Sequence, residues 1–210
     1  MSKSIVEAEP AVAADLFGSR IEIARQYTAD LAARGEELGL IGPLEPPRLW
    51  SRHIVNCVLL APLLRPGLVG DIGSGAGLPG LVLAIARPDV DFVLIEPMER
   101  RVDWLVQEAA DLGLENVEVV RARAEEAKLA KPLSQVTARA VTALTKLIPA
   151  TVPLMLDGGE LVFLKGARVA EEVTAAAKQI RKAHLINVEV VELGVGIVPE
   201  VTRVFRATVD

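Results

Sequence analysis

A glycine-rich segment constrains the fold of this chain more than any other feature. Residues 69–80 read Val-Gly-Asp-Ile-Gly-Ser-Gly-Ala-Gly-Leu-Pro-Gly. Glycines at this spacing let the backbone turn tightly from a strand into a helix and let a ligand lie against it. Because an apolar run of strand length leads into the segment, we interpret it as the first strand, turn and helix of a nucleotide-binding α/β fold. An ordinary glycine-rich turn is the alternative.

Short apolar runs alternate with helical patterns along the chain after residue 67. Seven runs have the length and composition of strands: residues 68–72, 91–95, 117–120, 134–137, 161–164, 187–191 and 201–207. Alternation of this kind predicts a doubly wound sheet of parallel strands. The stretch 192–200 between the last two runs is too short for a helical crossover, so we expect these two strands to pair antiparallel at one edge.

Two amphipathic helices are predicted before residue 67. Apolar side chains recur at helical spacing in residues 12–31 and again in residues 46–60, where two prolines suit the first helical turn. We expect residues 1–66 to form an N-terminal helical cap and residues 67–210 to form the ligand-binding domain. Both should belong to one globular unit, because a chain of 210 residues can bury a single core.

Charge and cysteine content exclude several classes of protein. With 23 Lys plus Arg against 28 Asp plus Glu, the net charge is −5, so nucleic-acid binding would depend on a local basic patch. The single cysteine, Cys57, excludes an internal disulfide and a multi-cysteine zinc site, and we expect no bound metal.

The apolar runs are too short to cross a membrane, and residues 1–10 contain no apolar signal core. We therefore expect a cytoplasmic protein.

The glycine-rich segment is compatible with two classes of cofactor. Gly75, Gly77 and Gly80 have the spacing of a dinucleotide-binding turn, and Glu96, at 96 − 75 = 21 residues beyond Gly75, is placed to bind ribose hydroxyls. That carboxylate would serve the ribose of NAD or of S-adenosylmethionine. Asp71 separates the two, because an acidic strand end is poorly placed beside a pyrophosphate and well placed near the ammonium of a methionine group. Charge complementarity favours S-adenosylmethionine.

The same residues resemble the first motif of class I S-adenosylmethionine-dependent methyltransferases, and Leu156-Asp-Gly-Gly159 resembles a turn common in them. A closer resemblance extends over essentially the whole chain, to the bacterial ribosomal RNA small subunit methyltransferase G family, also called glucose-inhibited division protein B. It rests on motifs in matching order and spacing: Arg52-His53-Ile54, Gly75-Ala-Gly-Leu-Pro-Gly80, Glu96-Pro97, Arg100-Arg101-Val102, Arg123-Ala124-Glu125-Glu126, Ala138-Arg139-Ala140 and Leu164-Lys165-Gly166.

This resemblance implies a class I methyltransferase fold, which is Rossmann-like, with a seven-stranded sheet whose last strand is antiparallel. It implies methyl transfer from S-adenosyl-L-methionine to N7 of one guanine, guanine 527, in the 530 loop of 16S ribosomal RNA. The partner would be that RNA or the small ribosomal subunit, assembling or mature, and we expect the enzyme to be a monomer. Its loss is expected to reduce streptomycin susceptibility. The alternatives are a small NAD-dependent oxidoreductase and a noncatalytic, cofactor-sensing ribosome-assembly factor.

Cofactor-binding residues are expected beyond the carboxyl ends of the strands, where ligands of doubly wound sheets bind. We assign Asp71 to the methionine ammonium, Gly73, Gly75 and Leu78 to the methionine and ribose, and Glu96 to the ribose hydroxyls. Ala124 and Glu125 are assigned to the adenine, in agreement with the family. Arg139, charged within an uncharged stretch, can meet the cofactor carboxylate or a nucleotide phosphate, and the family resemblance places it at the cofactor.

RNA would be bound by basic residues around the same crevice, and the residues assigned to it are Arg52, His53, Arg123, Lys165 and Arg203. We also expect Arg48, Arg52 and Asn56 to share one face of the second cap helix, and Arg206 to extend the basic rim. Guanine N7 carries a free lone pair, so its methylation requires no general base. No catalytic side chain is therefore assigned.

Overall fold

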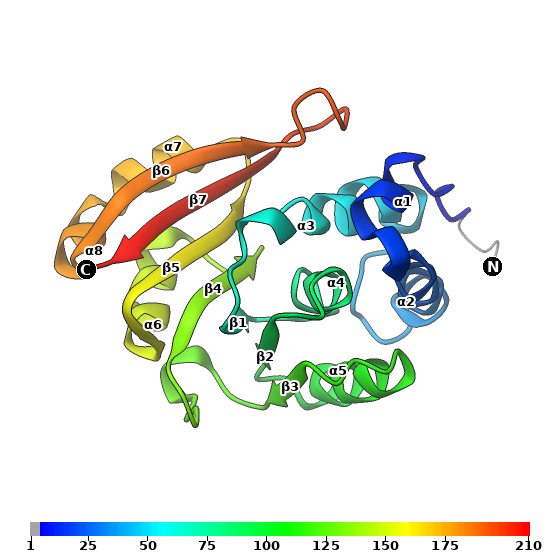
Figure 1. The fold of residues 1–210 in the computed structure, drawn as a ribbon, viewed down its shortest axis with the longest axis horizontal. Coiled ribbons are helices and arrows are strands. Elements are labelled where there is room, and N and C mark those ends of the chain that lie inside the picture. The colour runs from blue at the N-terminus through cyan, green and yellow to red at the C-terminus, as the bar shows by residue number, and fades with distance from the viewer. Residues whose placement is uncertain (1–4) are drawn as a thin grey trace.

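The computed structural model describes residues 5–210. Residues 1–4, which belong to the segment from which we expect no signal sequence, lie outside the described residues. The described part of the chain forms one seven-stranded sheet with helices on both faces and a helical cap at its N-terminal end (Figure 1). The strands are β1 (Leu68–Ile72), β2 (Asp91–Ile95), β3 (Val117–Val120), β4 (Leu133–Arg139), β5 (Met155–Lys165), β6 (Leu185–Leu193) and β7 (Thr202–Val209).

The order of the strands is β3-β2-β1-β4-β5-β7-β6. The first five strands are parallel to one another, and β7 pairs antiparallel with both β5 and β6, as the short connection after β6 predicts. All seven predicted strands are therefore confirmed. β5 begins earlier than expected, because Leu156-Asp-Gly-Gly159 lies inside the strand as an irregularity, with Gly158 at φ 74°, rather than as a turn before it.

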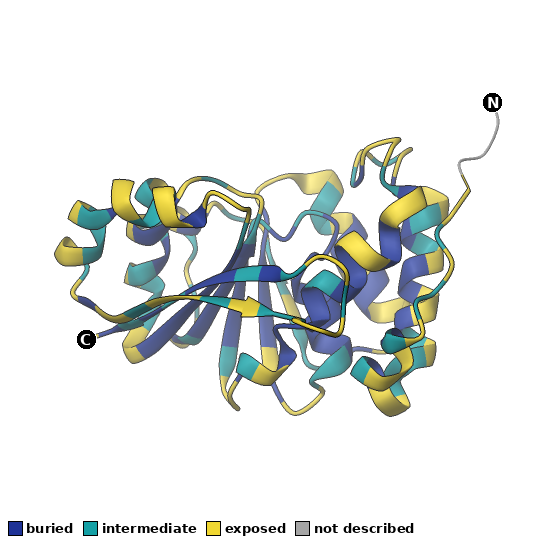
Figure 2. Ribbon diagram, turned by 90° about the horizontal axis from the view of Figure 1, so that it is seen from above, coloured by how far each residue is buried: buried dark blue, intermediate teal, exposed yellow. Residues whose placement is uncertain are grey.

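Helices cover the sheet on both sides. α4 (Gly80–Ala86), α5 (Glu99–Asp111) and the cap pack on one face, and α6 (Leu144–Thr151), α7 (Val169–Ala175) and α8 (Ala177–Lys182) pack on the other. Successive residues of β2 alternate between the two cores: Phe92 and Leu94 join the cap side, and Val93 and Ile95 join the other. Strands buried on both faces read as continuous apolar runs, and Figure 2 shows them enclosed by helices with exposed outer surfaces.

The cap is helical but less regular than its sequence pattern predicts. The first predicted helix is divided into α1 (Val12–Phe17), the 3₁₀ turn η1 (Gly18–Arg20) and α2 (Ile21–Arg34), because Gly18 adopts φ 52°. The second is a succession of a 3₁₀ turn, η2 (Pro46–Arg48), a π-helix, η3 (Leu49–Val55), and α3 (Asn56–Val58). Short 3₁₀ turns η4 (Ala61–Leu63), η5 (Ala124–Glu126) and η6 (Val152–Leu154) complete the helical elements of the described residues.

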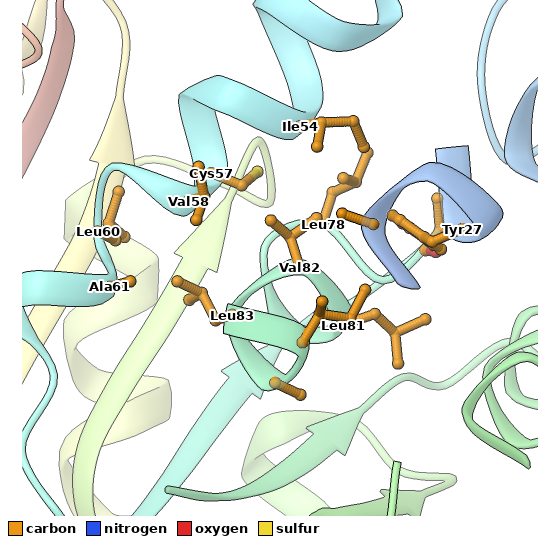
Figure 3. Packing of buried hydrophobic residues seen from close by; sticks show 14 of the residues in the cluster. Tyr27, Ile54, Cys57, Val58, Leu60, Ala61, Leu78, Leu81, Val82 and Leu83 are labelled. Atoms are coloured by element: carbon orange, nitrogen blue, oxygen red, sulfur yellow. The ribbon is translucent and has the colours of Figure 1, made fainter. Parts of the chain in front are cut away.

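Side chains of the cap and of α4 share one core. Tyr27 from α2, Ile54 from η3 and Cys57 from α3 pack around Leu81 and the other α4 residues shown in Figure 3. The cap thus buries the apolar outer face of the helix that follows the glycine-rich segment. The boundary that we expect near residue 66 separates two sequence patterns that contribute to one hydrophobic cluster. Among residues 5–210, no helix is long and apolar enough to cross a membrane.

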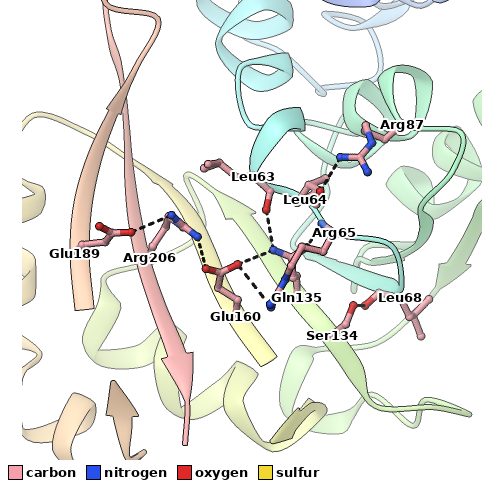
Figure 4. Close-up of polar contacts among 10 residues, drawn as sticks. All are labelled: Leu63, Leu64, Arg65, Leu68, Arg87, Ser134, Gln135, Glu160, Glu189 and Arg206. Carbon is pink, nitrogen blue, oxygen red and sulfur yellow. Dashed lines mark hydrogen bonds and ion pairs between the residues drawn. The ribbon is translucent and has the colours of Figure 1, made fainter. Parts of the chain in front are cut away.

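A polar cluster joins the cap to the amino-terminal end of the sheet (Figure 4). The buried Gln135 amide donates to the Leu63 carbonyl at 3.0 Å and to Glu160 at 2.8 Å. Arg206 forms ion pairs with Glu160 and Glu189. The guanidinium of Arg206 therefore belongs to this structural cluster. It does not extend a basic rim around the crevice, whereas the sequence predicts that it does.

Glu108 on α5 is fully buried, and within residues 5–210 neither of its carboxyl oxygens has a hydrogen-bond partner. Burial, with a smaller contribution from nearby Asp30, raises the pKa of Glu108 to about 7. Its folded-state pKa lies above its ordinary value of 4.5. The folded protein therefore binds this proton more tightly than the unfolded chain, and stability falls as the pH rises through about 7.

We expect Glu108→Gln to remove this loss of folding stability at higher pH. The shift corresponds to at most roughly 3 kcal/mol at neutral pH, so the variant should be more stable than the parent at pH 8 and nearly equal to it at pH 5. Urea denaturation at both pH values measures the difference, with exposed Glu115→Gln as the control. Comparison with the parent is needed because buried Asp71, whose pKa burial also raises to about 7, contributes the same trend. Parallel pH profiles for the variant and the parent would contradict the assignment.

Candidate functional site

The loop between β1 and α4 is held in place by hydrogen bonds on each side. The Gly73 N–H donates to the Ile95 carbonyl at 2.8 Å, which fixes the loop against the end of β2. Beneath the loop, the fully buried Asp71 carboxylate accepts the Gly80 N–H at 3.0 Å and the Thr137 hydroxyl at 3.2 Å. Gly80 is required here, because a Cβ would lie 2.6 Å from the Asp71 carboxylate and 2.4 Å from Leu94. Asp71 therefore ties the loop to α4 and β4.

Two aromatic side chains fix the centre of the same loop. The Tyr27 hydroxyl and the Trp104 indole N–H both donate to the Ala76 carbonyl, each at 2.9 Å. Tyr27 comes from the cap and Trp104 from α5, so the loop is bonded to elements on two sides. The polar atoms of buried Tyr and Trp normally find a partner, but the sequence did not identify which one.

Glu96 connects the loop to the end of β2. Its side chain is 2% exposed, and its two oxygens accept the N–H groups of Gly75 and Met98, each at 3.0 Å. A carboxylate has about four acceptor positions, so these two bonds leave capacity for the hydroxyl groups of a ligand. Arg101 lies 3.9 Å from Glu96 and supplies a compensating charge.

A cavity of about 410 Å³ opens at the carboxyl ends of the parallel strands. This volume lies within the range of small-molecule sites. Its walls come from the ends of β1, β2 and β4, the segment after β3, and α6. The lining residues are Ile72, Gly73, Ile95, Glu96, Pro97, Met98, Arg101, Ala122, Arg123, Ala124, Glu125, Ala140, Val141, Thr142, Lys146, Leu147 and Ala150. Gly73 leaves no room for a side chain in this wall, because a Cβ there would lie 2.9 Å from Val141, which also lines the cavity.

Four of the residues predicted to bind a cofactor line this cavity, namely Gly73, Glu96, Ala124 and Glu125. The other four lie outside its wall as the structure describes it. Asp71 faces Gly80 and Thr137 below the loop, Gly75 supports Glu96, and Leu78 packs in the core with the cap (Figure 3). These three residues support the loop. The Asp71 carboxylate points toward Gly80 and Thr137, whereas the sequence predicts that it contacts a ligand ammonium.

Arg139, the fourth of these residues, points toward the cap. One guanidinium nitrogen donates to the Cys57 sulfur at 3.2 Å and to the His53 carbonyl at 3.5 Å, and the other donates to His53 Nδ1. An arginine can only donate hydrogen bonds, so Nδ1 is unprotonated and the imidazole proton lies on Nε2. That Nε2–H donates to Glu45 at 2.6 Å. Burial and the Arg139 charge lower the pKa of His53 to about 4, so this ring is neutral at pH 7.

The residues expected to bind RNA have different environments. Arg123 is exposed and lines the cavity, and the Arg52 side chain is about half exposed on η3. His53 is buried between Arg139 and Glu45. Lys165 donates to the Thr142 carbonyl and to Glu172, each at 2.9 Å, and its side chain is only 8% exposed, so it joins β5 to the cavity wall.

Arg203 and Asn56 both lie where β7 meets the cap. Arg203 is the β7 residue opposite Lys165 and forms an ion pair with Glu192 at 2.9 Å. The Asn56 amide donates to the Thr202 hydroxyl. The π-helix changes the helical periodicity. Arg48 and Arg52 both lie beside Glu45, but Asn56 turns toward β7, so only two of the three residues expected on one face lie together. Within the described residues, no group of three or more His, Cys, Asp or Glu side chains is arranged to hold a metal ion.

Comparison with known proteins gives a family and a set of relatives for this chain. The family model described as rRNA small subunit methyltransferase G matches residues 20–198. A ribosomal RNA small subunit methyltransferase G from Clavibacter michiganensis is 70% identical over 205 residues, covering 98% of this chain and 97% of that protein.

Two solved structures share the fold at low sequence identity. A SAM-dependent methyltransferase from Aquifex aeolicus matches 91% of this chain and 98% of its own, with a TM-score of 0.54 and 18% identity. A SAM-dependent O-methyltransferase from Thermotoga maritima matches 73% of this chain and 64% of its own, with a TM-score of 0.56 and 18% identity. The architecture is that of class I S-adenosylmethionine-dependent methyltransferases.

Proposed function

This chain belongs to the rRNA small subunit methyltransferase G family and is an rRNA methyltransferase, and from this premise we propose that it methylates N7 of guanine 527 in the 530 loop of 16S ribosomal RNA, with S-adenosylmethionine as the methyl donor. The observation that carries the choice of donor is the cavity at the carboxyl ends of the strands, with the buried Glu96 carboxylate in its wall. The family resemblance supports the choice of nucleotide.

The residues of the cavity fit the donor. Glu96 retains acceptor positions for ribose hydroxyls after binding two backbone N–H groups. Gly73 allows the ligand to approach the backbone, and Ala124 offers a small apolar surface beside the polar Glu125 for an adenine ring. When bound, S-adenosylmethionine supplies an activated methyl group on a positively charged sulfur.

The protein's part in the reaction is orientation. Guanine N7 has a lone pair available for attack, so the chain does not have to remove a proton before transfer. No histidine lines the cavity among the described residues, and His53 is occupied by Arg139 and Glu45, in agreement with this. The loop is bonded to Asp71, Glu96, Tyr27 and Trp104 before any ligand binds, and such preorganisation lowers the barrier to transfer.

The RNA would approach Arg123 in the cavity wall and Arg52 in the cap, whose exposed charges suit phosphate contacts. We propose the 16S RNA or the small subunit as the partner and the cytoplasm, where ribosomes act, as the location; the monomeric state stays a prediction. Family membership leaves neither the NAD-dependent oxidoreductase nor the noncatalytic assembly factor with a supporting observation.

We expect Glu96→Ala to weaken S-adenosylmethionine binding about tenfold to a hundredfold without unfolding the protein. Loss of a hydrogen bond to a charged group costs roughly 1.5–3 kcal/mol. Titration calorimetry measures the affinity, with Glu99→Ala, an exposed residue at the start of α5, as the matched control. Unchanged affinity in a folded Glu96→Ala protein would remove Glu96 from the site.

The proposed function is tested by transfer of labelled methyl from S-adenosylmethionine to naked 16S RNA, to assembly intermediates and to the mature subunit. The modified nucleotide is then mapped. Label at N7 of guanine 527 supports the proposal and identifies the RNA state that the enzyme prefers. Label at another nucleotide would overturn the choice of target while leaving the class of enzyme intact.

A further inference from the structure

The Glu45 carboxylate lies close to three side chains of the cap that carry positive charge or donate hydrogen bonds. It forms an ion pair with Arg48 at 2.6 Å, accepts the His53 Nε2–H at 2.6 Å, and lies 3.7 Å from Arg52. Burial would raise the pKa of Glu45, but the hydrogen bonds from Arg48 and His53 outweigh it and hold the pKa below its ordinary value. Glu45 is therefore ionised at neutral pH, and its charge offsets that of the arginines beside it.

The exposures of these side chains show which contacts an approaching molecule can reach. The side chains of Arg48 and Arg52 are 45% and 51% exposed, whereas those of Glu45 and His53 are 19% and 10% exposed. An anion arriving from solvent meets both guanidinium groups first and meets the carboxylate as a competitor. A phosphodiester suits these groups as well as a carboxylate does, because arginine binds the oxygens of either in the same geometry.

We propose that Glu45 occupies, in the free protein, the place that a phosphodiester of the RNA substrate takes when it binds to the cap. The inference rests on the proposed function, since it requires an RNA substrate. On binding, the phosphate takes the Arg48 and Arg52 contacts, and the Glu45 carboxylate moves away from them and from His53. Glu45 thereby weakens nonspecific RNA binding, because every RNA must displace an internal anion before it gains these two contacts.

Displacement of Glu45 by a phosphate changes the contacts of His53, which connects the cap to the cofactor side of the protein. Its ring bridges Glu45 and Arg139, and Arg139 precedes Ala140, Val141 and Thr142 in the cavity wall. Loss of the Glu45 contact leaves the His53 Nε2–H free for another acceptor, and a phosphate oxygen is the acceptor that RNA supplies. His53 then becomes an RNA contact only after the exchange, which reconciles its burial in the free protein with its expected role in substrate binding.

The test compares the binding of an RNA fragment containing the 530 loop by Glu45→Gln and by Glu37→Gln. Both substitutions remove one negative charge, but Glu37 is exposed and forms no ion pair among the described residues. At low salt we expect Glu45→Gln to bind RNA about three to ten times more tightly than Glu37→Gln does. That gain should disappear when Arg48 and Arg52 are also changed to Ala. Equal affinities for the two single variants, or weaker binding by a folded Glu45→Gln protein, would overturn the inference.

A second measurement uses the unaltered protein and remains valid if Glu45→Gln fails to fold. The chain has two histidines, so nitrogen-15 spectra of the imidazoles contain two sets of signals, which a His184→Gln variant assigns. Addition of the RNA fragment should shift the His53 Nε2 signal and leave His184 unchanged. If RNA binds and the His53 signal does not move, the displacement of Glu45 is contradicted but the proposed function is not. If the parent protein neither binds the RNA nor transfers a methyl group, the proposed function is contradicted.

Discussion

Replacement of Gly73 by valine is expected to abolish S-adenosylmethionine binding, with an affinity loss of at least a hundredfold. Gly73 adopts φ 65°, and its added side chain would begin 2.9 Å from Val141 in the wall of the cavity. The substitution therefore places atoms where the ligand must approach the backbone. It also introduces backbone strain of roughly 1–2 kcal/mol, because side-chain-bearing residues disfavour this conformation.

Gly113→Val separates these two effects. Gly113, which follows α5, has nearly the same φ, 63°, and a Cβ there meets no atom within 4 Å. Gly113→Val should lose only the stability that backbone strain costs, and Gly73→Val should lose somewhat more because of its contact with Val141, as thermal denaturation measures. Only Gly73→Val should fail to bind the methyl donor in calorimetry. If Gly73→Val folds and binds S-adenosylmethionine as the parent does, the cavity is not the donor site.

Replacement of Arg139 by alanine should reduce methyl transfer to RNA about a hundredfold while changing donor affinity less than about twofold. Arg139 contacts His53 and Cys57 in the cap, not the cavity wall, so its removal disrupts the cap and leaves the donor site intact. A hundredfold loss corresponds to roughly 2.7 kcal/mol, as expected for hydrogen bonds made by a charged group.

Calorimetry and a methyl-transfer assay together decide between this expectation and the prediction from the sequence that Arg139 binds the cofactor. A large fall in donor affinity would restore Arg139 to the cofactor site, as the family resemblance implies, and would contradict the role of Arg139 as a residue that positions the cap. In cells lacking the parent protein, Arg139→Ala should also fail to restore streptomycin susceptibility, whereas the exposed variant Glu37→Gln should restore it.

The strands were predictable because their signals are local. β1, β2 and β3 begin and end at the predicted residues, since each is a short apolar run between glycines, prolines or charged residues. The cap helices were less predictable. A π-helix changes the spacing of side chains without a distinctive composition, and Gly18 interrupts a pattern that remains amphipathic on both sides.

The partners of charged residues could not be predicted from the sequence at all. Arg139 was expected to need a partner, and it has one, but His53 lies 86 residues away in the chain. Lys165 is predicted to bind RNA because it is a basic residue at a strand end. In the structure it is paired with Glu172 on α7, and the sequence does not distinguish a paired lysine from an exposed one. Pairings of this kind depend on the tertiary arrangement, so a sequence pattern identifies the crevice more reliably than the direction in which each side chain points.

The bond between Trp104 and the Ala76 carbonyl gives this protein an internal optical probe. Indole fluorescence is sensitive to the surroundings of the ring, and the N–H of this indole is bonded to the loop that we assign to the methyl donor. The other tryptophan, Trp50, lies in the π-helix beside Arg52 and His53, so it probes the cap. Single-tryptophan versions of the chain would therefore follow donor and RNA separately in real time, without an attached dye, and reveal the order in which the two arrive.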